Sequence, residues 1–181
     1  MKKILITGTG RCGTTFLIKL FTYLGFDTGF TKKNFSKFIN KVCNSGMEKD
    51  YKENHQVIKS PFFIEGIDKI NQEIEIEYII IPIRYYHDSA KSRVRYKDRP
   101  GGLWNAKNEE EQVIFFHKLV SNYIYQMTKY NLPTLFINFE KMISDKKYLF
   151  DTLQPVLSNR NISFEDFSSS YDEATSTSKP K

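Results

Sequence analysis

A glycine-rich stretch near the N-terminus has the residue types and spacing of a loop that binds anions. The stretch GTGRCGTT, from Gly8 to Thr15, contains three glycines, the cation Arg11 and the neighbouring hydroxyls of Thr14 and Thr15. Glycines let the backbone approach an anion closely, and the N–H groups at the start of a following helix attract negative charge. We therefore expect this stretch to bind phosphate or sulfate groups. The alternative is a tight turn that binds no ligand.

The spacing of this loop differs at one position from that of ATP- and GTP-binding loops. A Walker A loop reads G-x4-G-K-[ST], and here Thr14 occupies the position of the lysine that contacts the β- and γ-phosphates. The nearest cation is Arg11, inside the loop. An anionic nucleotide is therefore expected, but an ordinary ATP or GTP site is not.

Cys12 lies in the same loop, between Arg11 and Gly13. A neighbouring cation and a helix N-terminus lower the pKa of a thiol, which would allow a redox or nucleophilic role. The interpretation that we prefer is a cysteine in place of a serine of similar size. The second cysteine, Cys43, has no metal-ligand spacing to Cys12, and the two indicate a reducing compartment rather than a structural disulfide.

Lys59 directly follows a short apolar strand predicted at residues 57–58, and Pro61 disfavours helical geometry just after it. Ligands of open α/β sheets bind at the carboxyl ends of the strands. Lys59 is therefore expected at the same sheet edge as the glycine-rich loop. A surface lysine at a strand end is an equally simple interpretation.

Arg84 ends the clearest buried strand of the sequence, the apolar run at residues 78–83. Pro82 in this run has no N–H for a central strand, so we expect it where the strand leaves the sheet. A helix is predicted to start at Asp88, and it places Asp88 and Ser92 one turn apart on one face. Arg84 and Ser92 could together hold a second phosphate. The alternative is a surface arginine, with Asp88 as a helix cap.

Apolar strands alternate with amphipathic helices along the chain, which predicts an α/β fold with a mainly parallel β-sheet flanked by helices. The predicted strands cover residues 4–6, 57–58, 78–83 and 134–139, and the main predicted helices cover about 16–24, 62–67, 88–96 and 109–130. Ser144 is expected to cap a last helix, and one short helix is expected near residues 35–42. We expect one domain over residues 1–167, followed by a flexible tail, rich in serine and threonine, over residues 168–181.

The charge and composition of the chain exclude some classes of partner. Lys and Arg number 27 against 21 Asp and Glu, a net charge of +6 that suits an anionic ligand, although solvated lysines produce the same value. No arginine-rich block or basic–aromatic repeat indicates a nucleic-acid partner. No apolar run is long enough to span a membrane, and the run before Thr7 is too short for a signal peptide. We expect a soluble, cytoplasmic protein.

Three stretches together resemble the sulfotransferase family that uses 3′-phosphoadenosine 5′-phosphosulfate (PAPS). Residues 10–17 are similar to the family's 5′-phosphosulfate loop, [KR]-S-G-T-T-x-L, with Arg11 in the basic position and Cys12 in place of the serine. Residues 139–142, FEKM, resemble the (Y/F)-E-x-(L/M) segment near the C-terminal end of the family pattern.

The remaining stretch is similar to the family's 3′-phosphate motif, R-x-P-x-D-x3-S. It reads Arg84-x3-Asp88-x3-Ser92, with Tyr86 in place of the proline. The three stretches occur in the family's order and span about the first 150 residues. The resemblance implies a P-loop-like sulfotransferase fold, with PAPS as the donor and 3′,5′-bisphosphoadenosine as the product.

The resemblance also implies a role for each matching residue. The backbone of residues 13–15 would hold the 5′-phosphosulfate, with Arg11 as the cation of the loop. Arg84 and Ser92 would hold the 3′-phosphate. Lys59 would neutralise the charge that develops on the bridging oxygen as the sulfuryl group leaves. Nothing in this chemistry requires Mg²⁺ or another metal.

The general base is the group that removes the proton of the acceptor. Some family members use a histidine two residues after the lysine, where this chain has Pro61, and others use a glutamate from the region after the first helix. The corresponding region here offers Asp27, and we choose Asp27 and His55 as candidates. The remaining candidates are Glu65, His87 and His117.

These observations predict an enzyme that transfers a sulfuryl group from PAPS to a hydroxyl of a carbohydrate or small-molecule acceptor. Two alternatives stay open. A P-loop kinase-like phosphotransferase would bind ATP with Mg²⁺, and the absence of a loop lysine counts against it. A catalytically inactive nucleotide-binding module would bind the nucleotide without transferring any group.

Overall fold

The computed structural model describes residues 2–40, 45–96, 99 and 101–176 of the chain. Its central sheet has four parallel strands in the order β4-β1-β5-β6. The strands span Lys3–Ile6 (β1), Val57–Lys59 (β4), Ile76–Ile83 (β5) and Thr134–Asn138 (β6). The predicted class, an α/β fold built on a mainly parallel sheet, is therefore confirmed.

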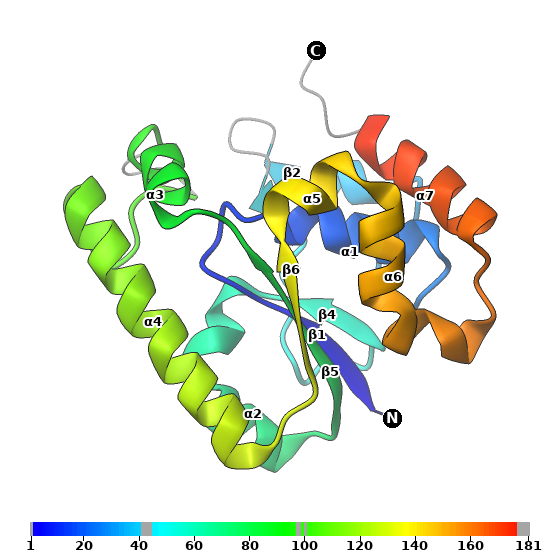
Figure 1. Cartoon of the computed structure of the whole chain (residues 1–181), viewed down its shortest axis with the longest axis horizontal. Coiled ribbons are helices and arrows are strands. Elements are labelled where there is room, and N and C mark those ends of the chain that lie inside the picture. The colour runs from blue at the N-terminus through cyan, green and yellow to red at the C-terminus, as the bar shows by residue number, and fades with distance from the viewer. Residues whose placement is uncertain (1, 41–44, 97–98, 100, 177–181) are drawn as a thin grey trace.

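Helices cover both faces of this sheet, so the molecule has three layers (Figure 1). One face packs against α2 and α4, and the other packs against α1, α6 and α7. The helices span Thr14–Tyr23 (α1), Ile67–Glu73 (α2), Tyr86–Val94 (α3), Glu109–Tyr130 (α4), Phe139–Ser144 (α5), Lys146–Leu157 (α6) and Phe164–Ser176 (α7). Helix α3 packs on α4 beyond the end of the sheet, next to the glycine-rich loop.

Strand β1 is buried on both faces because helices cover each of them. Ile4 and Ile6 belong to the core on the α1 side, and Leu5 belongs to the core on the α4 side. Successive side chains of a strand point to opposite faces, so a strand covered on both sides has apolar residues on both, as the run of residues 4–6 does. The four-residue strand KILI is thus held firmly in the core, and the glycine-rich loop that follows it begins at the carboxyl end of the sheet.

Pro82 lies inside β5, a central strand, and is paired in register with Ile137 of β6. Ile79 donates its N–H toward the β6 side, to Pro133. Because amide groups alternate in direction along a strand, the position of the missing N–H of Pro82 faces the β1 side. Strand β1 has ended by that point, at Ile6, so the proline removes no hydrogen bond from the ladder. The sheet thus accepts Pro82 at the place where β1 turns into the loop.

The C-terminal segment differs from the predicted flexible tail. Residues 168–176 belong to helix α7, which packs against α1. The side chains of Phe167, Tyr171 and Ala174 are buried, and the hydroxyl of Tyr171 donates to the carbonyl of Met142 at 3.1 Å. The tail prediction is corrected for these residues, and residues 177–181 lie outside the described part of the chain.

Two further predictions on local structure are also corrected. Asp145, not Ser144, caps helix α6, because its carboxylate accepts the N–H of Tyr148 at 2.9 Å. The short helix near residues 35–42 is a 3-10 turn, η1 (Phe35–Phe38), followed by a small antiparallel sheet of β2 (Ile39–Asn40) and β3 (Ser45–Gly46). Cys43 lies outside the described residues.

No helix in the described part of the chain has the length and apolarity needed to cross a membrane. The predicted cytoplasmic location stays a prediction.

Candidate functional site

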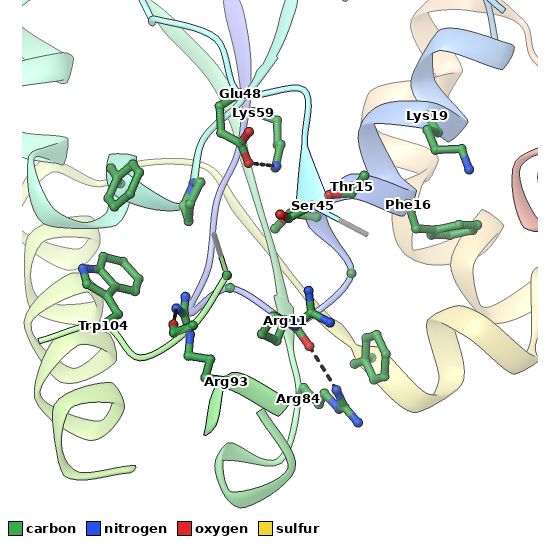
Figure 2. Close-up of a pocket in the computed structure, with 18 of the residues that line it drawn as sticks. Arg11, Thr15, Phe16, Lys19, Ser45, Glu48, Lys59, Arg84, Arg93 and Trp104 are labelled. Atoms are coloured by element: carbon green, nitrogen blue, oxygen red, sulfur yellow. Dashed lines mark hydrogen bonds and ion pairs between the residues drawn. The ribbon is translucent and has the colours of Figure 1, made fainter. Parts of the chain in front are cut away.

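A pocket of about 650 Å³ opens at the carboxyl ends of the strands, where the glycine-rich loop, β4 and β5 end. Figure 2 shows Arg11, Arg84, Lys59, Arg93 and Trp104 around this space. The structure thus brings together three stretches that the sequence analysis placed at one sheet edge. The described residues that line the pocket are Gly10, Arg11, Gly13, Thr14, Thr15, Phe16, Lys19, Ser45, Glu48, Lys59, Pro61, Phe62, Arg84, Arg93, Arg99, Gly101, Gly102, Leu103, Trp104, Phe139, Ile143 and Thr175.

The glycine-rich loop lines one side of the pocket, and helix α1 starts within the last residues of that loop. Gly13 caps the helix with a left-handed backbone (φ 90°), and Thr14 and Thr15 form its first turn. A Cβ on Gly13 would lie 2.4 Å from Cε of Met142. Only glycine satisfies both the backbone conformation and this contact with α5. Gly13, Thr14 and Thr15 all line the pocket, so the N-terminus of α1 is available there to bind an anion.

Hydrogen bonds join Arg11 of the glycine-rich loop to Arg84 and Ser92. Arg11 Nε donates to Ser92 Oγ at 3.0 Å, and Arg84 Nη1 donates to the carbonyl of Arg11 at 3.2 Å. Arg84 Nε is buried and has no hydrogen-bond partner among the described residues, while its guanidinium lies 4.8 Å from the ring centre of Phe139. Ser92 is not itself part of the pocket lining and lies behind Arg11.

Lys59 enters the pocket from the end of β4 and forms an ion pair with Glu48. Its Nζ also donates to the carbonyl of Gly46 at 2.7 Å. Burial lowers the pKa of Lys59, and Glu48 opposes this shift. The sequence analysis did not identify Glu48, because that residue comes from the polar segment before β4 and only the fold carries it to the lysine.

Arg93 is a second residue that the sequence analysis missed. It lies on α3, is 7% exposed, and donates from Nη2 to the carbonyl of Thr9 at 3.1 Å and from Nη1 to the carbonyl of Gly102. Its guanidinium lies 5.2 Å from the ring centre of Trp104. Arg93 thus joins the glycine-rich loop to the segment that forms the opposite wall of the pocket.

That opposite wall is aromatic. Phe62, which is 58% exposed, and Trp104 meet edge to face with ring centres 5.4 Å apart. The buried side chain of Gln112 holds the backbone of Trp104 by accepting its N–H at 2.7 Å and donating to its carbonyl at 3.1 Å. The wall is therefore fixed to helix α4, and it lines the same pocket as Lys59.

Lys19, one turn further along α1, also lines the pocket. Its side chain is buried, and this burial lowers the pKa of Lys19 from 10.5 to about 8. The ammonium group lies 5.2 Å from the ring centre of Phe35. A lysine on an amphipathic helix is usually solvated, so nothing local in the sequence distinguishes Lys19, and only the fold places it at the pocket.

Cys12 is fully buried and does not line the pocket. Burial is the main influence on its thiol, and it raises the pKa of Cys12. The environment that would have activated the thiol is therefore not present, and the interpretation of Cys12 as a small residue packed behind the loop agrees with the structure.

Asp27 and His55 do not lie at the pocket. The Asp27 carboxylate contacts His55 Nδ1 at 3.0 Å, and the carbonyl of Asp27 accepts the N–H of Val57, the first residue of β4. Since the pocket is at the carboxyl ends of the strands, this pair lies at the opposite edge of the sheet. The structure therefore does not bring either of the two predicted bases to this pocket. Glu65, His87 and His117 are likewise not among its described lining residues.

The lining is strongly basic. Among the described lining residues, six are Arg or Lys and one, Glu48, is acidic. Such a pocket can bind a ligand with several negative charges and can place one carboxylate next to it. Comparison with protein-family models, curated proteins and solved structures finds no match for this chain.

Proposed function

We propose that this pocket binds PAPS and that the protein transfers its sulfuryl group to a hydroxyl of a carbohydrate or small-molecule acceptor. The observation that carries the proposal is the convergence of Arg11, Arg84 and Lys59 on one pocket from three distant parts of the chain. The donor has a 3′-phosphate and a 5′-phosphosulfate, which are separated along the molecule. Cations at separate places around one pocket suit such a ligand.

The nucleotide would lie across the side of the pocket formed by α1 and α5. The N–H groups at the start of α1 would bind the 5′-phosphosulfate, and Arg84, supported by the contact of Arg11 with Ser92, would bind the 3′-phosphate. The side chains of Phe16, Phe139 and Ile143 line the same region. Apolar and aromatic surface of this kind suits the flat adenine base.

The transfer needs a cation at the oxygen that leaves and a base for the acceptor proton. The acceptor oxygen forms a bond to sulfur while the bond between sulfur and the bridging oxygen breaks, and the electron pair leaves on the 5′-phosphate. Lys59 would neutralise that oxygen. Glu48, its ion-pair partner, would accept the proton of the attacking hydroxyl. One contact would thus supply both groups.

The acceptor would approach from the aromatic wall. Phe62 follows Lys59 by three residues, and Trp104 meets it edge to face. These rings offer apolar surface next to the proposed reacting groups. An acceptor whose hydroxyl is carried on a ring could lie against this wall with its hydroxyl toward Glu48.

Calorimetric titration tests the proposal, with 3′,5′-bisphosphoadenosine in one experiment and ATP with Mg²⁺ in another. We expect bisphosphoadenosine to bind at least about 30-fold more tightly than ATP, because the proposed contacts of Arg84 need a 3′-phosphate. Tighter binding of ATP with Mg²⁺ would instead support a phosphotransferase. Tight binding of bisphosphoadenosine without sulfation of any hydroxyl compound in a broad acceptor panel would support an inactive nucleotide-binding module.

A further inference from the structure

Arg93 is a cation that the fold buries beside the glycine-rich loop. A Cβ on Gly10 would lie 2.3 Å from Nη2 of Arg93, so the guanidinium is packed directly against the loop backbone. Its hydrogen bonds within the described part of the chain go to the carbonyl oxygens of Thr9 and Gly102. Nε of Arg93 is buried and has no partner among the described residues.

The positive charge of Arg93 has no acidic partner in the described part of the chain. None of its hydrogen bonds or ion pairs there goes to a carboxylate, and its remaining neighbours are the rings of Trp104 and Phe116 at 5.2 and 5.7 Å. Carbonyl dipoles and ring faces stabilise a guanidinium, but they do not neutralise it. Burial lowers the pKa of Arg93 to about 10. The Cys12 thiol opposes this shift, and the nearby charge of Arg11 adds to it.

A buried charge without a counter-charge is costly, since burial removes its hydration and nothing of opposite sign replaces it. A protein retains such a charge most readily where a ligand supplies the opposite sign. Arg93 meets this condition, because it lines the basic pocket and contacts the loop that faces the ligand. Because its side chain is only 7% exposed, it acts on a bound anion mainly through the electric field of its charge in a low-dielectric site and through its hydrogen bond to Thr9.

We propose that Arg93 is a positioning residue whose charge is neutralised by the bound anion rather than by the protein, and that this charge sets the affinity of the glycine-rich loop for anions. The inference rests on the proposed function only in that the pocket binds a polyanion. It adds a residue outside the sequence motifs, and it predicts that affinity depends on a largely buried side chain in the pocket wall.

The test compares Arg93→Gln and Arg93→Lys, titrated calorimetrically with 3′,5′-bisphosphoadenosine and, separately, with inorganic pyrophosphate. Neither side chain can bridge the carbonyls of Thr9 and Gly102 as a guanidinium does, but lysine keeps the charge. We expect Arg93→Gln to weaken both ligands by at least about 30-fold and Arg93→Lys to stay within about 5-fold of wild type. Lys91→Gln, an exposed change of the same charge on the same helix, should alter affinity by less than about 2-fold.

The outcomes separate the two proposals. Equal losses of affinity in the Gln and Lys variants would overturn the inference, because they would show that the hydrogen bonds to Thr9 and Gly102 matter and the charge does not. Unchanged affinity in Arg93→Gln would overturn it as well. If wild type binds both ligands equally and Arg93→Gln weakens both, the inference stands and the PAPS assignment falls. If wild type binds neither ligand, both fall. Circular dichroism shows whether each variant folds. If Arg93→Gln does not fold, Arg93→Met, whose side chain fills the space beside Trp104, takes its place.

Discussion

The ammonium group of Lys59 and the carboxylate of Glu48 form an ion pair that joins the end of β4 to the segment after β3. The two partners differ in exposure, because the side chain of Lys59 is 2% exposed and that of Glu48 is 40% exposed. The lysine is thus the buried partner and the carboxylate is the accessible one. This is the arrangement that the proposed transfer needs, with a fixed cation and a base that a bound hydroxyl can reach.

Replacing Glu48 with glutamine should remove the base and keep the shape of the pocket. We expect turnover to fall by roughly 10²- to 10³-fold, the range of a lost general base, while affinity for bisphosphoadenosine stays equal or increases because a negative charge leaves the pocket. Turnover is measured with an acceptor identified from a hydroxyl-compound panel. Glu65→Gln, an exposed change of the same charge, is the control and should behave as wild type. Normal turnover of Glu48→Gln would exclude this carboxylate as the base.

Replacing Lys59 with alanine should affect the chemical step more than donor binding. The ammonium would stabilise charge that develops only as the bridging oxygen leaves, so we expect turnover to fall by roughly 10²- to 10³-fold and bisphosphoadenosine affinity to change by less than about 5-fold. Single-turnover kinetics and calorimetry measure the two effects separately. Lys69→Ala, at an exposed lysine on α2, is the matched control. A large loss of affinity with unchanged turnover would assign Lys59 to binding alone.

Replacing Arg84 with alanine should distinguish nucleotides by their 3′-phosphate. We expect affinity for bisphosphoadenosine to fall by about 30-fold or more and affinity for AMP to change by less than about 3-fold, since AMP has no 3′-phosphate. Competition binding with the two nucleotides measures this difference. Arg95→Ala, an exposed arginine just after α3, controls for overall charge. Equal losses for both nucleotides would remove Arg84 from the 3′-phosphate site.

The pocket residues that could be predicted from the sequence are those that directly follow the end of a strand. The glycine-rich loop, Lys59 and Arg84 each come directly after an apolar run, and parallel strands bring their carboxyl ends together. Glu48 and Arg93 reach the pocket through tertiary contacts, and neither lies at a strand end. Such contacts leave no local pattern in the sequence.

The wrong predictions also have physical reasons. Asp27 follows the first helix, as the expected base region does, but that point of the chain has already returned to the amino-terminal edge of the sheet, beside the start of β4. The C-terminal segment is rich in serine and threonine, and this composition concealed an apolar set at 167, 171 and 174 with helical spacing. Burial of that set against α1 outweighs the weak helix propensity of the serines.

Lys19 should make anion binding depend on proton uptake. Burial lowers the pKa of Lys19 to about 8, whereas the unfolded chain has the ordinary value of 10.5. Between these values the unfolded state holds more protons, so this group makes stability rise with pH from about 8 to 10.5. A bound anion favours the charged form, and at pH 8 we expect up to about half a proton to be taken up with bisphosphoadenosine.

Calorimetric enthalpies in two buffers of different ionisation enthalpy measure this uptake at pH 8. The phosphate groups of the ligand, with a second pKa near 6, are already ionised there and contribute little. Lys19→Met should abolish the uptake, whereas Lys32→Met, at an exposed lysine, should retain it. The same uptake in Lys19→Met as in wild type would assign the proton to another group.

Helix α7 should contribute to the core rather than behave as a dispensable tail. The ring of Phe167 is fully buried and lies between Phe150 and Tyr171, with ring centres 5.3 and 6.4 Å away. Phe167→Ala should therefore lower the free energy of unfolding by about 3 to 5 kcal/mol, from lost burial and the cavity left behind. Phe164→Ala, at a ring that is 40% exposed in the same helix, should lower it by less than about 1.5 kcal/mol. Urea denaturation followed by tryptophan fluorescence and circular dichroism measures both values. Equal, small effects of the two substitutions would show that α7 does not belong to the cooperative core.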